Sequence, residues 1–455
     1  MVRVPLYHEP VGSLSQRRMP RPRLLLALGC ALVLLGVGAW WALAQRSPGE
    51  ISGSSTEEFI AASTTGPAAA PSAAPMDWPT YGFDPARSHT NSGLAHHPPF
   101  RQRWLFHAMS LLEFPPSVAD GRLFFGQLRG RFFAVDTKTG ERIWTHPTGN
   151  CSAASPTIVG DVVYAAFLAK YPCPKGEPGA EGFVVAWAAA TGKRIWGVKL
   201  PPVESSPLVV NGVVYVGAWD GAVYALDAKT GAIRWKTMTD AQIVSSAAWV
   251  DAKQAGGRPA IAIGTNGGSI YELDAATGAV RWQGQSLDRL GSGREYFYAT
   301  PTVANGRVFA ANTDGWLYAF GAKTGRLLWA KAAGTYVYTA PVVAANVVYV
   351  GTYDGFVIAY DSGTGQQLWR VSVPGAVHGA PVLMDGLLYF STCAGCGQNG
   401  VRYAKSGPDR SYAIDIATHK IVWRFPDGKY SPLVADDKQV YLIGAGVIRA
   451  MVPTG

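Results

Sequence analysis

A short repeated sequence restricts the fold of this chain more than any other feature. Its fullest copy is SPLVVNGVVYVGAWDGAVYALDAKTGAIRW, which covers Ser206–Trp235. The tail of the unit, T-G-x-x-x-W, recurs at Thr139–Trp144, Thr191–Trp196, Thr230–Trp235, Thr277–Trp282, Thr324–Trp329 and Thr364–Trp369, and with His in place of Gly at Thr418–Trp423. The tryptophans that end successive units are 39 to 54 residues apart. A period of this size is typical of proteins that stack copies of one supersecondary unit.

Each unit predicts four short antiparallel strands. Turns such as Asn211-Gly212 and Asp220-Gly221 separate the first three strands, because these residue pairs adopt the positive φ that two-residue hairpins need. The T-G turn then leads into a fourth strand that ends at the Trp. Since a four-stranded sheet cannot bury both of its faces alone, the units must pack on one another, and radial packing of such units gives a β-propeller.

The number of units predicts how the ring closes. Seven full units end at Trp144 through Trp423, and Ser431–Val452 supplies three further strands. The missing fourth strand is Arg101–Phe106, so the sequence predicts an all-β, eight-bladed propeller whose last blade uses both ends of the repeat region and leaves no free sheet edge. We expect each repeated Trp to be a wedge between blades. We also expect one group of aspartates to cap the T-G turns rather than bind metal: Asp136, Asp227, Asp274, Asp361 and Asp415.

Composition and charge exclude several classes of protein. With 48% hydrophobic and 16% charged residues, the chain is neither a disordered tail nor a coiled coil. The net charge is +9, but residues 1–23 hold five arginines and one glutamate, and no Lys/Arg run follows. Because nucleic-acid binding needs a concentrated basic face, we expect no nucleic-acid partner.

The segment Leu24–Ala44 has 21 residues without a charge, which is long enough to span a bilayer. Four arginines precede it closely and only Arg46 follows it, so the positive-inside rule keeps the N-terminus cytoplasmic. The alternative is a signal peptide cleaved near Ala44. The sequence thus predicts a cytoplasmic basic tail (1–23), a single-pass transmembrane signal-anchor helix in the cell membrane (24–44), a flexible Ser/Ala/Pro-rich linker (45–76) and an extracytoplasmic propeller (77–455), or secretion after cleavage.

The repeat, together with Asp77-Trp78-Pro79-Thr80-Tyr81-Gly82, resembles the PQQ-like (pyrroloquinoline quinone) propeller repeat family over residues 77–452. This resemblance implies one of two functions, because some members are calcium- and PQQ-dependent alcohol or sugar dehydrogenases and others are non-catalytic. The dehydrogenases typically carry two adjacent cysteines beside the cofactor, and this sequence has no Cys-Cys pair. Glu113 lies where such enzymes often have a glutamate that contacts PQQ.

The top face of a propeller, where the loops before the first strand and after the second strand of each blade meet, is the usual place for a ligand. Three residues before the first-strand proline, blades 1 to 8 present a ring of equivalent positions: Glu113, Ala153, Glu204, Val244, Tyr298, Tyr338, His378 and Lys429. Tyr296, Phe297 and Tyr336 add to an aromatic group there. The alternatives are a ligand or partner site, or a solvated channel mouth with hydrophobic packing between loops. Glu113 with Glu204 is the candidate pair for PQQ or Ca²⁺, although Ca²⁺ needs about six to eight oxygen ligands.

Four cysteines follow the apolar segment, an even number in an oxidising compartment. Folding the hairpin of blade 2 brings Cys151 near Cys173, which predicts a disulfide. In blade 7, Cys393 and Cys396 predict a second, loop-closing disulfide. Cys393, Cys396 and His378 also suggest a metal site, but a fourth ligand is not evident.

The leading hypothesis is a monomeric, membrane-tethered, non-catalytic propeller that binds an envelope protein or a glycan at its top face, with no assured cofactor and no metal site. The alternative is a divergent PQQ- and calcium-dependent alcohol or sugar dehydrogenase, in which Glu113 contacts the cofactor. No Ser-His-Asp or phosphate-loop motif supports a hydrolase or an ATPase. The partner, the substrate and the biological process are not encoded in any motif of this sequence.

Overall fold

The computed structural model describes residues 49–62, 77–173, 179–287, 296–395 and 404–454. Within these ranges no helix is long and apolar enough to cross a membrane. The predicted tail and transmembrane span, residues 1–44, lie outside the described ranges. The chain divides into two compact units, and only the second, Gly49–Gly455, is described below.

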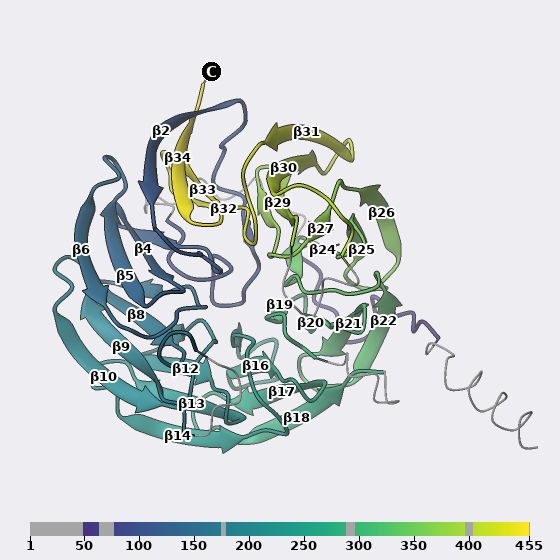
Figure 1. The fold of residues 1–455 in the computed structure, drawn as a ribbon. Helices are drawn as coiled ribbons and strands as arrows, with labels where there is room; N and C mark the ends of the chain where they lie inside the picture. The colour runs from purple at the N-terminus through teal and green to yellow at the C-terminus, as the bar shows by residue number, and fades with distance from the viewer. Residues whose placement is uncertain (1–48, 63–76, 174–178, 288–295, 396–403, 455) are drawn as a thin grey trace, which may run out of the picture. The chain divides into compact units, whose positions relative to one another are not determined.

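Eight sheets follow one another around a ring (Figure 1). Each sheet is one blade built on four antiparallel strands, and in blades 1 to 7 these four strands run outward in chain order. Blade 1 contains β3 (Ser117–Ala119), β4 (Arg122–Gln127), β5 (Arg131–Asp136) and β6 (Arg142–Pro147), and blade 2 contains β7 (Thr157–Val159), β8 (Val162–Phe167), β9 (Gly182–Ala188) and β10 (Arg194–Leu200). Blade 3 contains β11 (Leu208–Val210), β12 (Val213–Gly217), β13 (Ala222–Asp227) and β14 (Ile233–Met238). Blade 4 contains β15 (Ala248–Val250), β16 (Ala260–Gly264), β17 (Ser269–Asp274) and β18 (Val280–Gln285).

Blade 5 contains β19 (Thr302–Ala304), β20 (Arg307–Ala311), β21 (Trp316–Gly321) and β22 (Leu327–Ala332). Blade 6 contains β23 (Val342–Ala344), β24 (Val347–Gly351), β25 (Phe356–Asp361) and β26 (Gln367–Ser372). Blade 7 contains β28 (Val382–Met384), β29 (Leu387–Cys393), β30 (Arg410–Asp415) and β31 (Lys420–Phe425). The sheet of blade 7 also includes β1 (Thr90–Asn91) and β27 (Ala376–Val377).

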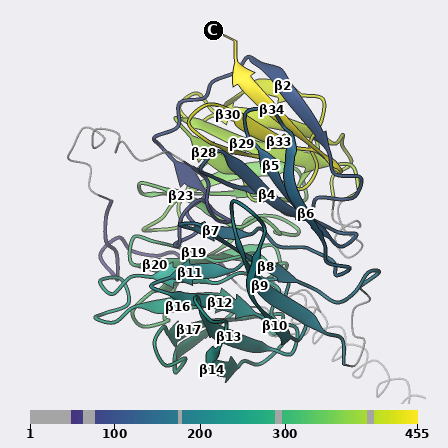
Figure 2. The same cartoon turned by 90° about the vertical axis from the view of Figure 1, so that its left-hand side faces the viewer.

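Blade 8 closes the ring as the sequence predicts. It contains β32 (Leu433–Ala435), β33 (Val440–Ile443) and β34 (Val447–Pro453) from the C-terminal end and β2 (Phe100–His107) as its outer strand. Trp104 of β2 faces Ala450 of β34 in antiparallel register, and both views show the two strands side by side (Figures 1 and 2). The predicted eight-bladed, all-β architecture is therefore confirmed.

The repeated tryptophans hold neighbouring blades together. Six of them donate the indole N–H to a backbone carbonyl of the next blade at 2.8–3.2 Å: Trp104, Trp144, Trp196, Trp235, Trp282 and Trp329. The T-G glycine of that next blade lies against the indole; at Gly231, with φ +77°, an added Cβ would stand 2.8 Å from the ring of Trp196. In blade 7 His419 replaces the glycine and stacks on Trp369 with ring centroids 5.1 Å apart. The wedge role of the tryptophans is confirmed.

The aspartates before the T-G turns accept hydrogen bonds from backbone N–H groups of those turns, as expected. Asp227 Oδ1, for example, accepts from the N–H groups of Lys229 and Thr230 at 3.0 and 2.9 Å. Asp136, Asp274, Asp361 and Asp415 make the same kind of contact. These carboxylates therefore stabilise turns.

The centre of the ring is filled by residues 77–91, which the sequence does not predict. A backbone N–H from the innermost strand of six blades donates to a carbonyl of this segment at 2.7–3.0 Å: Val118 to Trp78, Ile158 to Pro79, Trp249 to Pro85, Val303 to Ala86, Val343 to Ser88 and Leu383 to His89. In blade 3 the contact runs the other way, because the fully buried Arg87 donates to the carbonyl of Pro207 at 3.2 Å. We call residues 77–91 the central segment.

Part of the predicted linker also lies against the propeller. Ile51 bridges Ala330 of β22, and the N–H of Ala62 donates to Asn346 Oδ1 at 2.9 Å. The buried Arg307 donates to the carbonyls of Ser54 and Glu57 at 2.7 and 2.8 Å. Residues 49–62 are thus docked on blades 5 and 6, whereas residues 45–48 and 63–76 of the predicted linker lie outside the described ranges.

Candidate functional site

The top face carries a narrow cavity of about 40 Å³ above the central segment. Five of the eight predicted ring positions line it: Glu113, Val244, Tyr298, Tyr338 and His378. Each precedes the innermost strand of its blade, so the ring closure brings together residues that are far apart in sequence. Tyr81 of the central segment, together with Phe114 and Tyr430, completes the aromatic lining.

Aromatic rings from blades 5 to 8 form a continuous stack across this cavity. The ring centroids of Tyr298 and Tyr338 are 4.6 Å apart, those of Tyr338 and His378 are 4.5 Å apart, and those of His378 and Tyr430 are 4.6 Å apart. Tyr353 lies beside the stack, with its ring centroid 5.7 Å from that of His378, and pairs its hydroxyl with Nδ1 of His378. Such contacts stabilise the pairs beyond their buried area, so the stack is a rigid element of the top face.

The stack is electrically neutral in the physiological range. Burial lowers the pKa of His378 to about 3, and the positive charge of Lys429 lowers it further in the same direction. Burial raises the pKa of the Tyr338 hydroxyl well above its ordinary range, and Tyr298 and Glu204 add to the effect. Neither side chain is therefore charged near neutral pH.

The acidic ring position of blade 3 is buried and held by neutral donors. Glu204 accepts hydrogen bonds from the Trp219 indole N–H and the Tyr298 hydroxyl, both at 3.0 Å. The basic ring position of blade 8, Lys429, lies 3.6 Å from Asp409. The top face thus presents carboxylates beside an aromatic stack, with its lysine ion-paired at the rim.

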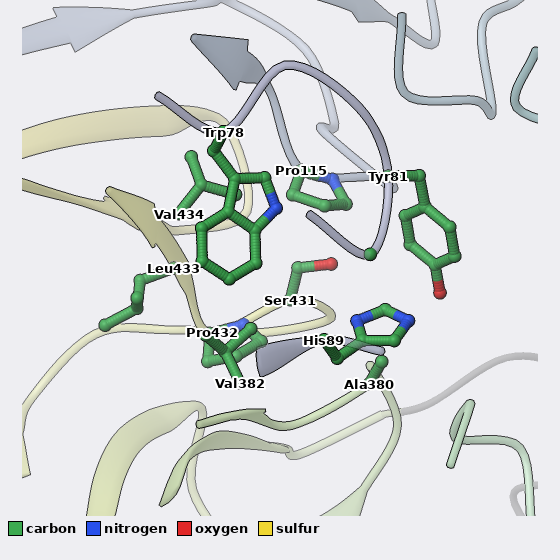
Figure 3. Close-up of a pocket in the computed structure, with 11 residues that line it drawn as sticks. Trp78, Tyr81, His89, Pro115, Ala380, Val382, Ser431, Pro432, Leu433 and Val434 are labelled. Atoms are coloured by element: carbon green, nitrogen blue, oxygen red, sulfur yellow. The ribbon is translucent and has the colours of Figure 1, made fainter. Parts of the chain in front are cut away.

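The central segment forms the floor of this region. A second, smaller cavity of about 10 Å³ lies beside Trp78, Tyr81 and His89, next to Ser431–Val434 of blade 8 (Figure 3). Burial lowers the pKa of His89 to about 3, and its Nε2 has no hydrogen-bond partner among the described residues. A space of this size holds one water molecule at most, so it is not a ligand pocket.

The sequence identifies the ring of positions at the top face, but it does not show how their side chains pack. Phe297 and Tyr336 are buried, which places them in the packing between loops, whereas Tyr296 remains half-buried at the surface. Two further aromatic residues of the top face, Trp219 and Tyr353, precede Asp-Gly turns and are not among the predicted residues. Aligning the blades on that turn would have shown a second ring of variable positions.

The predicted disulfide of blade 2 is confirmed, with Cys151 and Cys173 bonded at the edge of the top face. Cys393 is also disulfide-bonded, and its predicted partner Cys396 lies outside the described ranges. A disulfide-bonded sulfur is not a thiolate ligand, so Cys393 argues against the Cys-Cys-His metal site. Among the described residues, no cluster of three or more potential metal-binding side chains occurs.

Neither PQQ nor Ca²⁺ fits the side chains of this site. PQQ is a flat tricyclic tricarboxylate, whereas ligand pockets for molecules of that size measure roughly 300 Å³ or more, and the carboxylates of Glu113 and Glu204 would repel it. Both oxygens of Glu204 face neutral donors, which is not the oxygen-rich shell that Ca²⁺ requires.

Fold and blade signature together define a β-propeller of the PQQ-like repeat class. The chain belongs to the family described as outer membrane protein assembly factor BamB, whose model matches residues 100–170, 178–314, 266–395 and 313–434. The matched ranges extend over seven full blades and the start of the eighth.

Similar proteins share only parts of this chain or its fold. A serine/threonine-protein kinase AfsK from Streptomyces griseus is 28% identical over 145 residues, which is 29% of this chain and 16% of the kinase. A polyvinylalcohol dehydrogenase from Pseudomonas sp is 27% identical over 187 residues, 35% of this chain and 28% of the dehydrogenase. This chain therefore spans less than a third of the length of either relative. The crystal structure of BamB from Moraxella catarrhalis superposes with a TM-score of 0.61 at 20% identity, covering 78% of this chain and 100% of that one.

Proposed function

We propose that this propeller is a non-catalytic binding module of the cell envelope, which contacts a partner through its top face. The observation that carries this proposal is the filled centre of the ring. Among the described residues, the central segment and the aromatic stack leave a cavity of about 40 Å³. We therefore expect recognition on the surface above the stack rather than inside the ring.

Three further features support the proposal. The family is described by an outer membrane assembly factor, which favours a protein partner in the envelope. The disulfide-braced loop of blade 2 borders the top face, and loops that surround a rigid scaffold commonly carry binding residues. The half-buried Tyr296 and Trp219 are aromatic residues of the kind that protein interfaces use as anchors. A membrane anchor at residues 24–44 would keep the propeller at the cell envelope.

The alternative is a divergent PQQ- and calcium-dependent dehydrogenase. Similarity to a polyvinylalcohol dehydrogenase supports it, and Glu113 does line the cavity at the position expected for a cofactor contact. The small volume and the acidic lining argue against it. The binding module predicts that PQQ does not bind, and the dehydrogenase predicts that it does.

A titration distinguishes them. The purified chain is titrated by calorimetry with PQQ in millimolar Ca²⁺, and dye reduction is measured with alcohols and sugars. We expect no heat of binding and no dye reduction from the wild type or from Glu113→Gln. Saturable binding that Glu113→Gln abolishes, with substrate-dependent dye reduction, would establish the dehydrogenase and refute the binding module.

Partner contact is tested by site-specific photo-crosslinking of the full chain in intact cells. A photoreactive residue replaces Tyr296 or Trp219 on the top face, and the matched control replaces Asp161, an exposed residue in the turn between β7 and β8 on the opposite face. We expect one discrete envelope protein to crosslink from the top positions only. Equal crosslinking from all three positions, or from Asp161 alone, would contradict the proposal.

A further inference from the structure

A third cavity, of about 370 Å³, lies on the bottom face between blades 3 and 4. This face carries the turns between the first and second strands and the T-G turns, so it is opposite to the top face. Asn211, Arg234 and Trp235 of blade 3 form one wall, and Trp249 with Arg258 of blade 4 forms the other. The volume is within the range of roughly 300 to 1,000 Å³ that small-ligand pockets occupy.

One hairpin of blade 4 beside the cavity departs from the repeat. Residues 251–259 connect β15 to β16, where blade 3 uses the two residues Asn211-Gly212. This long hairpin leans on blade 5: Gln254 accepts a hydrogen bond from the N–H of Gly306 at 3.0 Å. The same hairpin supplies Arg258 and Pro259 to the lining of the cavity.

Trp249 forms the floor of the cavity, and it is also a departure from the repeat. The corresponding middle residue of the innermost strand is aliphatic in the other seven blades: Val118, Ile158, Val209, Val303, Val343, Leu383 and Val434. Trp249 is half-buried and lies 6.4 Å from Tyr215, between ring centroids, and Tyr215 lies 5.8 Å from Trp235. The polar ends of Tyr215 and Trp235 both donate to the carbonyl of Ala275, which fixes the orientation of the aromatic floor.

The rim of the cavity has more positive than negative charge. Arg234 pairs with Asp227 at 2.6 Å, and Asp274 pairs with Arg281 at 2.8 Å. Arg258 lies 3.6 Å from the same Asp274, and its side chain is 78% exposed. Of the charged residues that line the cavity, two are arginines, Arg234 and Arg258, and one is a carboxylate, Asp274. The exposed Arg258 makes the longest of these three ion pairs, and surface pairs are weak.

We propose that this cavity binds an acidic sugar, a pyranose ring that carries a carboxylate. An aromatic face has negative potential and attracts the polarised C–H groups of a sugar ring, which suits Trp249. An arginine fork binds a carboxylate in a bidentate manner, which suits Arg258. Asn211 and Thr277 line the same cavity and are exposed, so they offer polar groups to the ring hydroxyls of a sugar.

The test uses the purified chain and defined oligosaccharides. Tryptophan fluorescence and calorimetry measure binding of oligogalacturonate, with a neutral glucose oligomer of equal length and phenylacetate as comparison ligands. We expect saturable binding of oligogalacturonate alone, weakened about ten-fold or more by Trp249→Val or Arg258→Ala, since a tenfold loss is the size of one strong contact. Trp249→Val restores the residue of the other blades and so keeps the fold.

The controls separate this site from other effects. Arg194→Ala removes an exposed arginine of blade 2 and should leave binding unchanged. Absence of binding at millimolar oligogalacturonate, equal binding of the neutral oligomer, stronger binding of phenylacetate, or binding that survives both Trp249→Val and Arg258→Ala would each overturn the proposal. Since the cavity lies on the face opposite to the top face, this result is independent of the PQQ titration and of crosslinking at Tyr296.

Discussion

A buried carboxylate in blade 4 makes the stability of the propeller depend on pH. Glu272 lies on β17, where the other seven blades have alanine, and its cross-strand partner Ala262 replaces an aromatic residue. The side chain is fully buried, and neither carboxylate oxygen has a hydrogen-bond partner among the described residues. Burial raises the pKa of Glu272 from its ordinary value of 4.5 to about 8, and Arg281 at 3.7 Å opposes this rise only in part.

The sign of the effect follows from proton linkage. Between the two pKa values the folded protein keeps a proton that the unfolded chain has released, so the free energy of unfolding falls as the pH rises. The slope approaches about 1.4 kcal/mol per pH unit, and the loss between about pH 5 and about pH 7.5 is about 3 kcal/mol. For a propeller of this size that loss lowers the melting temperature by on the order of 4 °C.

The variant Glu272→Gln removes the titrating group at nearly constant volume. Melting temperatures and denaturant midpoints are measured at about pH 5 and about pH 7.5. We expect the wild type to lose stability at the higher pH and Glu272→Gln to lose about 3 kcal/mol less. The control Asp437→Asn changes an exposed carboxylate in blade 8 and should behave as the wild type. Equal pH dependence of the wild type and Glu272→Gln would refute the reasoning.

Three further changes test the packing of the ring. Arg87→Met leaves several central carbonyls without a hydrogen-bond donor, which lowers the free energy of unfolding by about 1–3 kcal/mol for each carbonyl. Hydrogen exchange of the innermost strands should therefore accelerate. Unchanged exchange would show that the Arg87 guanidinium is not needed. Gly231→Ala adds about 1–3 kcal/mol of overpacking against an indole to the strain of its backbone. The control Gly212→Ala has the backbone strain alone, because no atom lies within 4 Å of its added Cβ. Equal melting temperatures of the two variants would contradict the wedge role of the tryptophans. Replacing Cys151 and Cys173 by serine should destabilise blade 2 by about 3 kcal/mol, seen as faster proteolysis of that loop, and an unaltered cleavage rate would argue against it.

The architecture of the propeller follows from local signals, which is why the sequence predicts it well. The T-G turn requires a positive φ at positions such as Gly231, and the preceding aspartate caps the same turn. Each Trp then fixes the distance to the next blade. Because these signals act within a few residues or between adjacent blades, counting them yields the blade number and the closure by Arg101–Phe106.

The central segment could not be predicted, because backbone carbonyls do most of its binding. Residues 77–91 accept hydrogen bonds from six blades through carbonyl oxygens, which any amino acid supplies. Arg87 adds side-chain donors to this binding, and a single arginine in the sequence does not reveal that it is buried. For the same reason the sequence locates the top-face ring but not the size of the cavity, which depends on Tyr81 beneath it.

Departures from the repeat differ in whether the fold itself explains them. His419 replaces a glycine but stacks on the indole that the glycine would contact, and Glu272 fills the space that Ala262 leaves, so each change is compensated inside the molecule. Trp249 is different, because a larger side chain replaces an aliphatic one and, despite its ring contact with Tyr215, remains half-buried beside an open cavity. In a repeat protein, where identical positions do identical structural work, a large side chain that the core does not fully enclose indicates a requirement outside the fold. The ligand-binding constraint of blade 4 therefore lies at Trp249 rather than at its buried charge.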